Sequence, residues 1–320
     1  MGNRLKKIDV ALLAAITNSE FSQIDYENLL ANDPAKIRDE ELKLSLKALP
    51  EVPQQLKVEN IWIPSADQSG TIRLRLYRPK GKENLPILLY FHGGAFIYGT
   101  PEQYDSLFFP LALDIGALVV SVDYRLAPEH PFPAGMEDGY DTLLWLSEHA
   151  SDLGGDKDNI LIGGSSAGAT IAAAITHMAR DRREVEIRHQ YLLYPPTSHL
   201  LETRSMKELA NAPMQSRKAA EWMWKYYLND KTDPLPKYAV PLLEQNFKYL
   251  PDATVIVCEL DPLKDEGKAY AAKLEKAGVR VNLMEMPGAV HAFDFFPCPL
   301  SDHFYKYQVE LFKQILNQKK

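Results

Sequence analysis

Apolar residues follow two different patterns along the chain. In residues 55–64 and 71–79 apolar and polar residues alternate, as in antiparallel strands with one face exposed to solvent. Later strand-like segments are continuously apolar, which indicates burial on both faces. These segments are residues 85–94, 116–125, 159–166, 189–196 and 253–262, and a last strand is expected at residues 279–288. The pattern therefore predicts eight strands, with the first two at an antiparallel edge.

Helical periodicity fills the spaces between the buried strands. It covers residues 103–116, 134–150, 265–278 and 302–318, and a small-residue segment beginning at Ala167 follows the fifth strand. Gly278 is the expected C-cap of the helix at 265–278. Alternating buried strands and helices predict the α/β class, with a mostly parallel sheet covered by helices on both faces.

Two regions depart from this alternation. Residues 1–55 are polar and helix-prone, with amphipathic spacing at 37–49. Nearly sixty residues separate the sixth and seventh strands, which is too long for a simple crossover, and they include an aromatic-rich helical segment at 216–230. We therefore expect a core of residues 56–195 and 251–320, and a helical cap made of the insertion 196–250 together with 1–55.

Bulk properties narrow the functional classes. The 320 residues carry a formal net charge of −7 without a basic run, which argues against a nucleic-acid partner. The two cysteines, Cys258 and Cys298, lack metal-ligand spacing; we expect Cys258 to be a buried thiol, and a bridge between the two is the less favoured alternative. No histidine pair or phosphate-binding motif indicates a metal or a cofactor.

The sequence predicts no stable membrane anchor. No apolar run approaches the roughly 20 residues needed to span a bilayer. The apolar residues 10–16 imitate a signal peptide, but Asp9 interrupts the approach and no clear cleavage site follows. Lys6 stands where a myristoylation motif beginning at Gly2 requires serine or threonine. The expected location is the cytoplasm.

A candidate nucleophile lies at the joint between the fifth strand and its helix. Residues 164–168, GSSAG, match G-x-S-x-G in the strand–turn–helix context that this motif requires. Gly164 and Gly168 would leave room for a strained turn that raises the Ser166 hydroxyl above the sheet. Ser165, off the centre of the motif, is expected to be a supporting residue. A glycine-rich turn without chemistry is the alternative.

A serine nucleophile needs a base and a carboxylate, and the motif fixes their order along the chain. His291 follows the eighth strand and Asp261 follows the seventh, so Ser166, Asp261 and His291 occur in the expected order. Asp261 could instead cap a turn, and Asp265 is the second candidate for the acid.

The loop after the third strand is expected to stabilise an oxyanion. In the segment FHGGAF, Gly93 and Gly94 can present bare backbone amides, and Ala167 supplies a third. We expect His92 to be structural. In the segment YRLAPEHPFPA we expect a rigid loop held by a pair between Arg125 and Glu129.

These segments together resemble the hormone-sensitive-lipase family of esterases, bacterial family IV, in the α/β-hydrolase fold. HGGAF resembles its HGGG motif, GSSAGA its GDSAGG elbow, and DYRLAPEHPFPA, DPLKDEG and HAF resemble further family signatures. The resemblance runs from about residue 56 to the C-terminus. The chain departs from these motifs at Ala95, Ala169 and Ala292, which replace glycines, and at Ser165, which replaces an aspartate.

The residues and the resemblance together predict a serine carboxylesterase without cofactor that acts on short- to medium-chain acyl esters through an acyl-enzyme. An amidase or deacetylase with the same triad, or a non-catalytic small-molecule-binding relative, are the alternatives. The resemblance also makes a homodimer an expected assembly. Aromatic and apolar residues of the loop and the cap are candidates for the acyl pocket, although packing of the cap is the competing explanation for them: Phe96, Tyr98, Trp222, Met223, Tyr226 and Tyr227.

Overall fold

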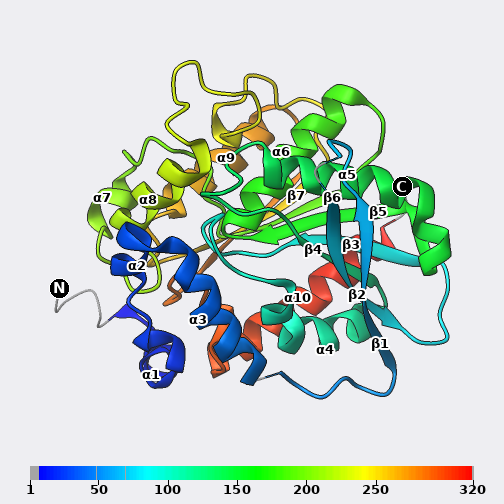
Figure 1. Ribbon diagram of the computed structural model, residues 1–320, viewed down its shortest axis with the longest axis horizontal. Helices are drawn as coiled ribbons and strands as arrows, with labels where there is room; N and C mark the ends of the chain where they lie inside the picture. Colours follow the sequence, from blue (N-terminus) through cyan, green and yellow to red (C-terminus); the bar gives the residue numbers. More distant parts are fainter. Residues whose placement is uncertain (1–6, 48, 69, 319–320) are drawn as a thin grey trace.

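The computed structural model describes residues 7–47, 49–68 and 70–318 (Figure 1). Gly2 and Lys6, on which the prediction about lipid attachment depends, lie outside these residues. The strands are β1 (Leu56–Pro64), β2 (Thr71–Pro79), β3 (Leu85–Phe91), β4 (Leu118–Asp123), β5 (Gly155–Ser165), β6 (His189–Leu193), β7 (Asp252–Cys258) and β8 (Val281–Met286). Each falls on one of the eight segments expected from the sequence, although β5 begins at Gly155, before the expected start at residue 159.

One sheet contains these strands in the order β1-β2-β4-β3-β5-β6-β7-β8. β1 pairs antiparallel with β2, and β2 antiparallel with β4, whereas all later neighbours are parallel. The predicted antiparallel edge and parallel centre are confirmed. Because parallel strands end at one edge of the sheet, the loops after β3, β5, β7 and β8 can meet there.

Helices cover both faces of the sheet (Figure 1). α5 (Ala134–His149), α6 (Ala167–Arg182) and α9 (Lys264–Lys276) lie on one face. α4 (Asp105–Ile115) and α10 (Pro299–Asn317) lie on the other face, and α1 (Val10–Asn18) packs against α10 on the same face. Separate clusters of buried apolar side chains fill the two spaces between helices and sheet. Short 3₁₀ helices complete this framework: Glu20–Gln23, Pro101–Tyr104, Ala150–Leu153, Pro241–Leu243 and Phe293–Phe295.

Two segments distant in sequence form a cap. α2 (Tyr26–Asn32) and α3 (Pro34–Lys47) come from the N-terminal segment, and α7 (Arg204–Glu208) and α8 (Arg217–Leu228) from the insertion after β6. α2 packs on α8, where Tyr226 Oη donates to the carbonyl oxygen of Leu30 at 2.8 Å (Figure 1).

α1 does not join these cap helices. It packs against α10 of the core, with Leu12 and Ile16 buried, and the N–H of Asp9 donates to the carbonyl oxygen of Gly288 at 3.0 Å. Its apolar side chains are buried in the same cluster as α10, so this part of residues 1–55 serves the core instead of the cap.

Local details follow the sequence expectations. Gly278 has φ +86° and its N–H donates to the carbonyl oxygen of Glu275 at 3.0 Å, as expected after the C-terminal end of α9. Cys258 and Cys298 are both free and buried, so the alternative of a bridge between them is wrong. Across the described ranges, none of the helices combines the length and the apolar character that a bilayer crossing needs.

Candidate active site

Ser166 occupies a strained turn between β5 and α6. Its φ of 52° and ψ of −125° are unusual for a residue with a side chain. The two flanking glycines make the turn sterically feasible. A Cβ on Gly164 would lie 2.4 Å from the carbonyl carbon of Gly168, and a Cβ on Gly168 would lie 2.0 Å from the carbonyl oxygen of Phe91. The elbow predicted from the sequence is therefore present in the structure.

Ser166, His291 and Asp261 form a continuous hydrogen-bonded chain. The Oγ of Ser166 lies 2.8 Å from His291 Nε2, and His291 Nδ1 lies 2.6 Å from Asp261 Oδ2. A carboxylate only accepts, so Nδ1 carries a proton and Nε2 is free to accept the proton of Ser166. This arrangement can activate the serine hydroxyl as a nucleophile.

Backbone hydrogen bonds fix the loops that carry the acid and the base. The N–H of Leu263 donates to Asp261 Oδ1 at 2.9 Å, so both carboxylate oxygens are engaged. The N–H of Leu260 donates to the carbonyl oxygen of Ala289 at 3.0 Å, which ties the loop after β7 to the loop after β8. Asp265 points elsewhere, since its Oδ2 accepts the N–H of Ser205 in α7 at 2.7 Å.

A second carboxyl group, that of Asp294, lies in the loop that carries His291 and was not predicted from the sequence. The ring of Tyr194 lies 4.6 Å from the imidazole of His291, and its hydroxyl donates to Asp294 Oδ1 at 2.9 Å. Burial raises the pKa of Asp294 to about 6. Asp294 stands three residues after His291, which is the only sequence signal that pointed to it.

The loop after β3 differs from expectation at one donor. The N–H of Gly93 donates to the hydroxyl oxygen of Tyr104 at 2.7 Å, so it is already occupied. In the described part of the chain the N–H groups of Gly94, Ala95 and Ala167 donate to no acceptor. The N–H groups of the expected donors Gly94 and Ala167 are therefore unpaired, whereas that of Gly93 is engaged with Tyr104, and Ala95 next to Gly94 carries a further unpaired N–H.

The backbone angles explain the glycine and alanine positions of this loop. Gly94 has φ +120°, and a Cβ there would lie 1.9 Å from the carbonyl oxygen of Tyr98, so only glycine fits. Ala95 has φ +55° and Ala292, beside His291, has φ +57°. The departures from glycine at Ala95 and Ala292 thus fall on left-handed positions, which alanine adopts at a small energetic cost.

His92 is a buried support for the loop after β3. Its imidazole is fully buried and stacks on Tyr124 with ring centroids 4.3 Å apart. Nδ1 lies 2.7 Å from the carbonyl oxygen of Gly93 and donates to it, because the carbonyl only accepts. Burial lowers the pKa of His92, which keeps the ring neutral. These contacts agree with the expected structural role.

The expected pair between Arg125 and Glu129 is wrong. Arg125 pairs with the buried Asp138 at 2.8 Å and with Asp67 at 2.9 Å. Glu129 pairs with Arg38 of α3 at 2.6 Å. Arg125 and Glu129 are close in sequence but do not pair, because their loop lies between the core and the cap. Arg125 pairs with carboxylates of the core, and Glu129 pairs with Arg38 of the cap.

Arg38 also contacts the backbone beside the site. Its Nε donates to the carbonyl oxygen of Ile97 at 2.6 Å and its Nη2 to that of Ala127 at 2.7 Å. One cap side chain therefore binds both the loop after β3 and the loop after β4. The sequence did not predict this contact, because Arg38 is one of several charged residues in the segment 37–49 and its partners depend on where α3 lies in the fold.

The candidate pocket residues separate into groups. Phe96 is buried and stacks on Tyr227 at 3.8 Å between centroids, with Met223 also buried in the cap. Trp222 stacks on Tyr226, and the hydroxyl of Tyr226 donates to the carbonyl oxygen of Leu30, so Tyr226 joins α8 to α2. The ring of Tyr98 lies 5.7 Å from that of Tyr26 in α2. Trp224, buried against Phe96, packs the cap onto the loop.

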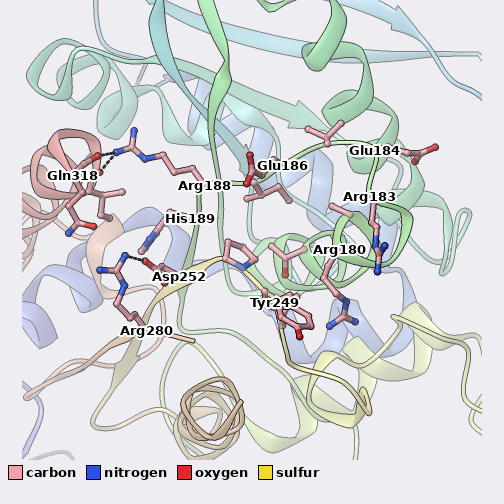
Figure 2. Close-up of a pocket in the computed structure, with 17 residues that line it drawn as sticks. Arg180, Arg183, Glu184, Glu186, Arg188, His189, Tyr249, Asp252, Arg280 and Gln318 are labelled. Atoms are coloured by element: carbon pink, nitrogen blue, oxygen red, sulfur yellow. Dashed lines mark hydrogen bonds and ion pairs between the residues drawn. The ribbon is translucent and has the colours of Figure 1, made fainter. Parts of the chain in front are cut away.

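A groove of about 1010 Å³ lies at the opposite end of the sheet, where α6 ends and β6 and β7 begin (Figure 2). Two of its basic side chains are engaged within the protein: Arg188 donates to the carbonyl oxygen of Gln318 at 2.5 Å, and Arg280 pairs with Asp252. Among the residues that the structure describes, no cluster of three or more histidine, cysteine or acidic side chains has the arrangement of a metal site.

Comparison with known proteins agrees with this geometry. A family model described as the α/β-hydrolase fold matches residues 88–295. The carboxylic ester hydrolase LipN of Mycobacterium tuberculosis is 34% identical over 292 residues, covering 89% of this chain and 77% of the relative. The carboxylesterase NlhH of the same species is 37% identical over 254 residues, covering 78% of this chain and 79% of the relative.

A solved structure of a bacterial heroin esterase superposes with a TM-score of 0.89 at 31% identity, covering 99% of this chain and all of the other. Residues 88–295, which the family model matches, contain Ser166, Asp261, His291 and the loop after β3. The chain therefore belongs to the α/β-hydrolase fold family, within its hormone-sensitive-lipase group of esterases.

Proposed function

We propose that this protein is a serine carboxylesterase that works through an acyl-enzyme. The observation that carries the proposal is the hydrogen-bonded chain from Ser166 through His291 to Asp261. Esterase names among relatives with 34–37% identity support the same class of reaction.

In the proposed acylation, Ser166 Oγ attacks the ester carbonyl carbon while His291 Nε2 takes the hydroxyl proton. Asp261 holds the imidazole in the required tautomer and stabilises its charged form. The N–H groups of Gly94, Ala95 and Ala167 receive the developing oxyanion, aided by the positive end of α6. His291 then gives its proton to the departing alkoxide, and the alcohol leaves.

Deacylation uses the same groups with water in place of the alcohol. His291 removes a proton from water, which attacks the acyl carbonyl, and the carboxylic acid leaves as Ser166 regains its proton. All steps are proton transfers and acyl transfers, so the residues of this chain suffice for the reaction.

We further propose short- to medium-chain acyl esters as substrates. The cap packs closely on the loop after β3 through Phe96, Tyr227 and Trp224. Ser166 and His291 are only 8% and 5% exposed, so the acyl group has to reach a nucleophile that is largely enclosed by the surrounding protein. The cytoplasmic location stays a prediction.

A fluorophosphonate probe tests the nucleophile. The wild-type protein should be labelled and Ser166→Ala should not, while Ser165→Thr, a neighbouring hydroxyl retained, should still be labelled. A series of p-nitrophenyl esters from acetate to palmitate should give the highest kcat/KM at short or medium length. A matched acetyl amide should react far more slowly than the acetyl ester. Absence of labelling and of ester hydrolysis would reject the proposal, and faster amide cleavage would replace it with an amidase.

A further inference from the structure

A buried tyrosine links the elbow to the loop after β3. Tyr104 Oη accepts the N–H of Gly93 at 2.7 Å and lies 2.5 Å from the Oγ of Ser165. Tyr104 and Ser165 are 2% and 1% exposed, so water does not compete for these bonds. The hydroxyl thus joins the residue before the nucleophile to the first glycine of the loop.

The protons of this link can be assigned from donor chemistry. A backbone N–H only donates, so Tyr104 Oη uses a lone pair for Gly93. The remaining bond between Tyr104 and Ser165 is made with a proton from either hydroxyl, and the three groups stay connected in both cases. Burial raises the pKa of Tyr104 above its usual range, so the link remains uncharged at neutral and moderately alkaline pH.

The loop that follows this link is under local strain. Gly94 and Ala95 both have positive φ, 120° and 55°, so the chain reverses direction immediately after Gly93. A strained loop keeps its shape only when neighbouring contacts hold it there. On one side His92 binds the carbonyl oxygen of Gly93, and on the other side Tyr104 binds its N–H.

The tyrosine ring is itself fixed. It lies edge-on to Phe295 with centroids 4.9 Å apart and stacks on Phe108 at 5.3 Å. Phe295 follows His291 in the same loop after β8. The ring is therefore packed between the loop that carries the base and the helix that follows the loop after β3.

We propose that Tyr104, supported by Ser165, is a positioning residue that sets the oxyanion donors. By holding the N–H of Gly93, its hydroxyl fixes the start of the turn and leaves the amides of Gly94 and Ala95 unpaired beside Ala167. This inference rests on the proposed function. It also gives Ser165 a role in place of the aspartate that the related motif carries there, with a neutral hydroxyl pair instead of a charge.

Removing the hydroxyl tests the proposal. Tyr104→Phe should lower kcat by roughly 10- to 100-fold, less than the loss of a whole oxyanion donor, because the donors are displaced and not deleted. KM should change by less than about threefold, since ground-state binding is unaffected. Ser165→Ala should have a similar effect, and the double variant should lose no more than about twofold beyond Tyr104→Phe, because the two hydroxyls act as one unit.

A thionoester comparison separates positioning of the oxyanion donors from general damage. Thiocarbonyl sulfur accepts N–H hydrogen bonds more weakly than carbonyl oxygen. A misaligned oxyanion site should therefore lower the ratio of ester to thionoester hydrolysis for the same acyl and leaving groups. Tyr140→Phe is the matched control: Tyr140 is equally buried, but its hydroxyl donates to Glu184 beyond the far end of α6. That variant should keep the wild-type ratio.

The outcomes are distinct. A wild-type ester to thionoester ratio in Tyr104→Phe, or an undiminished kcat, overturns the positioning role while leaving the serine esterase intact. If Tyr104→Phe does not fold, as judged by circular dichroism, Ser165→Ala decides alone by the same ratio. A wild-type protein that neither reacts with fluorophosphonate nor hydrolyses esters would reject the proposed function itself.

Discussion

The Asp261→Asn variant tests the proposed mechanism at its most buried polar contact. Asp261 is 1% exposed, with Oδ2 on His291 Nδ1 at 2.6 Å and Oδ1 on the N–H of Leu263 at 2.9 Å. The N–H of Leu263 needs an acceptor, so an asparagine would turn its oxygen toward Leu263. Its NH₂ group would then face His291 and donate to Nδ1.

This orientation forces the wrong tautomer on the base. With Nδ1 as acceptor, the imidazole carries its proton on Nε2 and donates to Ser166 instead of accepting from it. The expected loss in kcat is about 10⁴-fold, equivalent to about 5–6 kcal/mol of activation free energy at 1.36 kcal/mol per tenfold. Flipping the amide would place two donors against each other at Leu263, at a cost of about 1–3 kcal/mol, so it offers no escape.

Asp265→Asn provides the matched control. The carboxylate of Asp265 accepts the N–H of Ser205 at 2.7 Å, and the side-chain oxygen of an asparagine can still accept this N–H. The kcat of the variant should therefore stay within about threefold of the wild-type value. Both variants should be measured with p-nitrophenyl butyrate at saturation, with fluorophosphonate labelling to count active sites. The assignment is refuted if Asp261→Asn stays within tenfold of wild type, or if Asp265→Asn loses the activity instead.

Two further predictions concern the loop and the cap. Gly94→Ala should lower kcat at least about 100-fold or prevent folding, because a Cβ there would lie 1.9 Å from the carbonyl oxygen of Tyr98. Gly278→Ala is the control: the space around it is open, so it should lower the free energy of unfolding by only about 1 kcal/mol. Measurements of kcat and thermal unfolding check both variants, and a Gly94→Ala variant with wild-type activity would contradict the prediction. Glu41 accepts hydrogen bonds from Tyr26 and Gln103 at 2.7 Å, yet burial raises its pKa to about 7. The folded protein then keeps this proton up to about pH 7, while the unfolded chain releases it near pH 4.5, so stability should fall as pH rises through that window, by about 1–3 kcal/mol. Glu41→Gln should show a smaller fall in Tm between pH 5 and 8 than wild type, and an equal fall would argue against the shift.

The strand pattern determined the sheet. Alternating residues in β1 and β2 and continuous apolar runs from β3 onward distinguish half-exposed from fully buried strands, and this difference alone separates the antiparallel edge from the parallel centre. The G-x-S-x-G turn was only partly local: a Cβ on Gly164 would meet Gly168 four residues on, whereas a Cβ on Gly168 would meet the backbone of Phe91 at the end of β3.

Contacts between distant segments could not be predicted in the same way. The pairing of Arg38 with Glu129 joins residues 91 positions apart, and the sequence favoured the nearby Arg125. From the sequence, Tyr104 is one aromatic residue in a helical pattern. In the fold its hydroxyl contacts that of Ser165, which is 61 positions away in sequence. Side chains choose partners by distance in space, which periodicity does not encode.

The sequence by itself determined the class of fold, the elbow, and the order of nucleophile, acid and base, because each depends on residue types at strand ends and on local backbone sterics. Only the tertiary structure decided which backbone amides are unpaired and which charges tie the cap to the core. Hydrogen bonds form where donors and acceptors meet after the layers have packed, and that meeting is a property of the assembled fold.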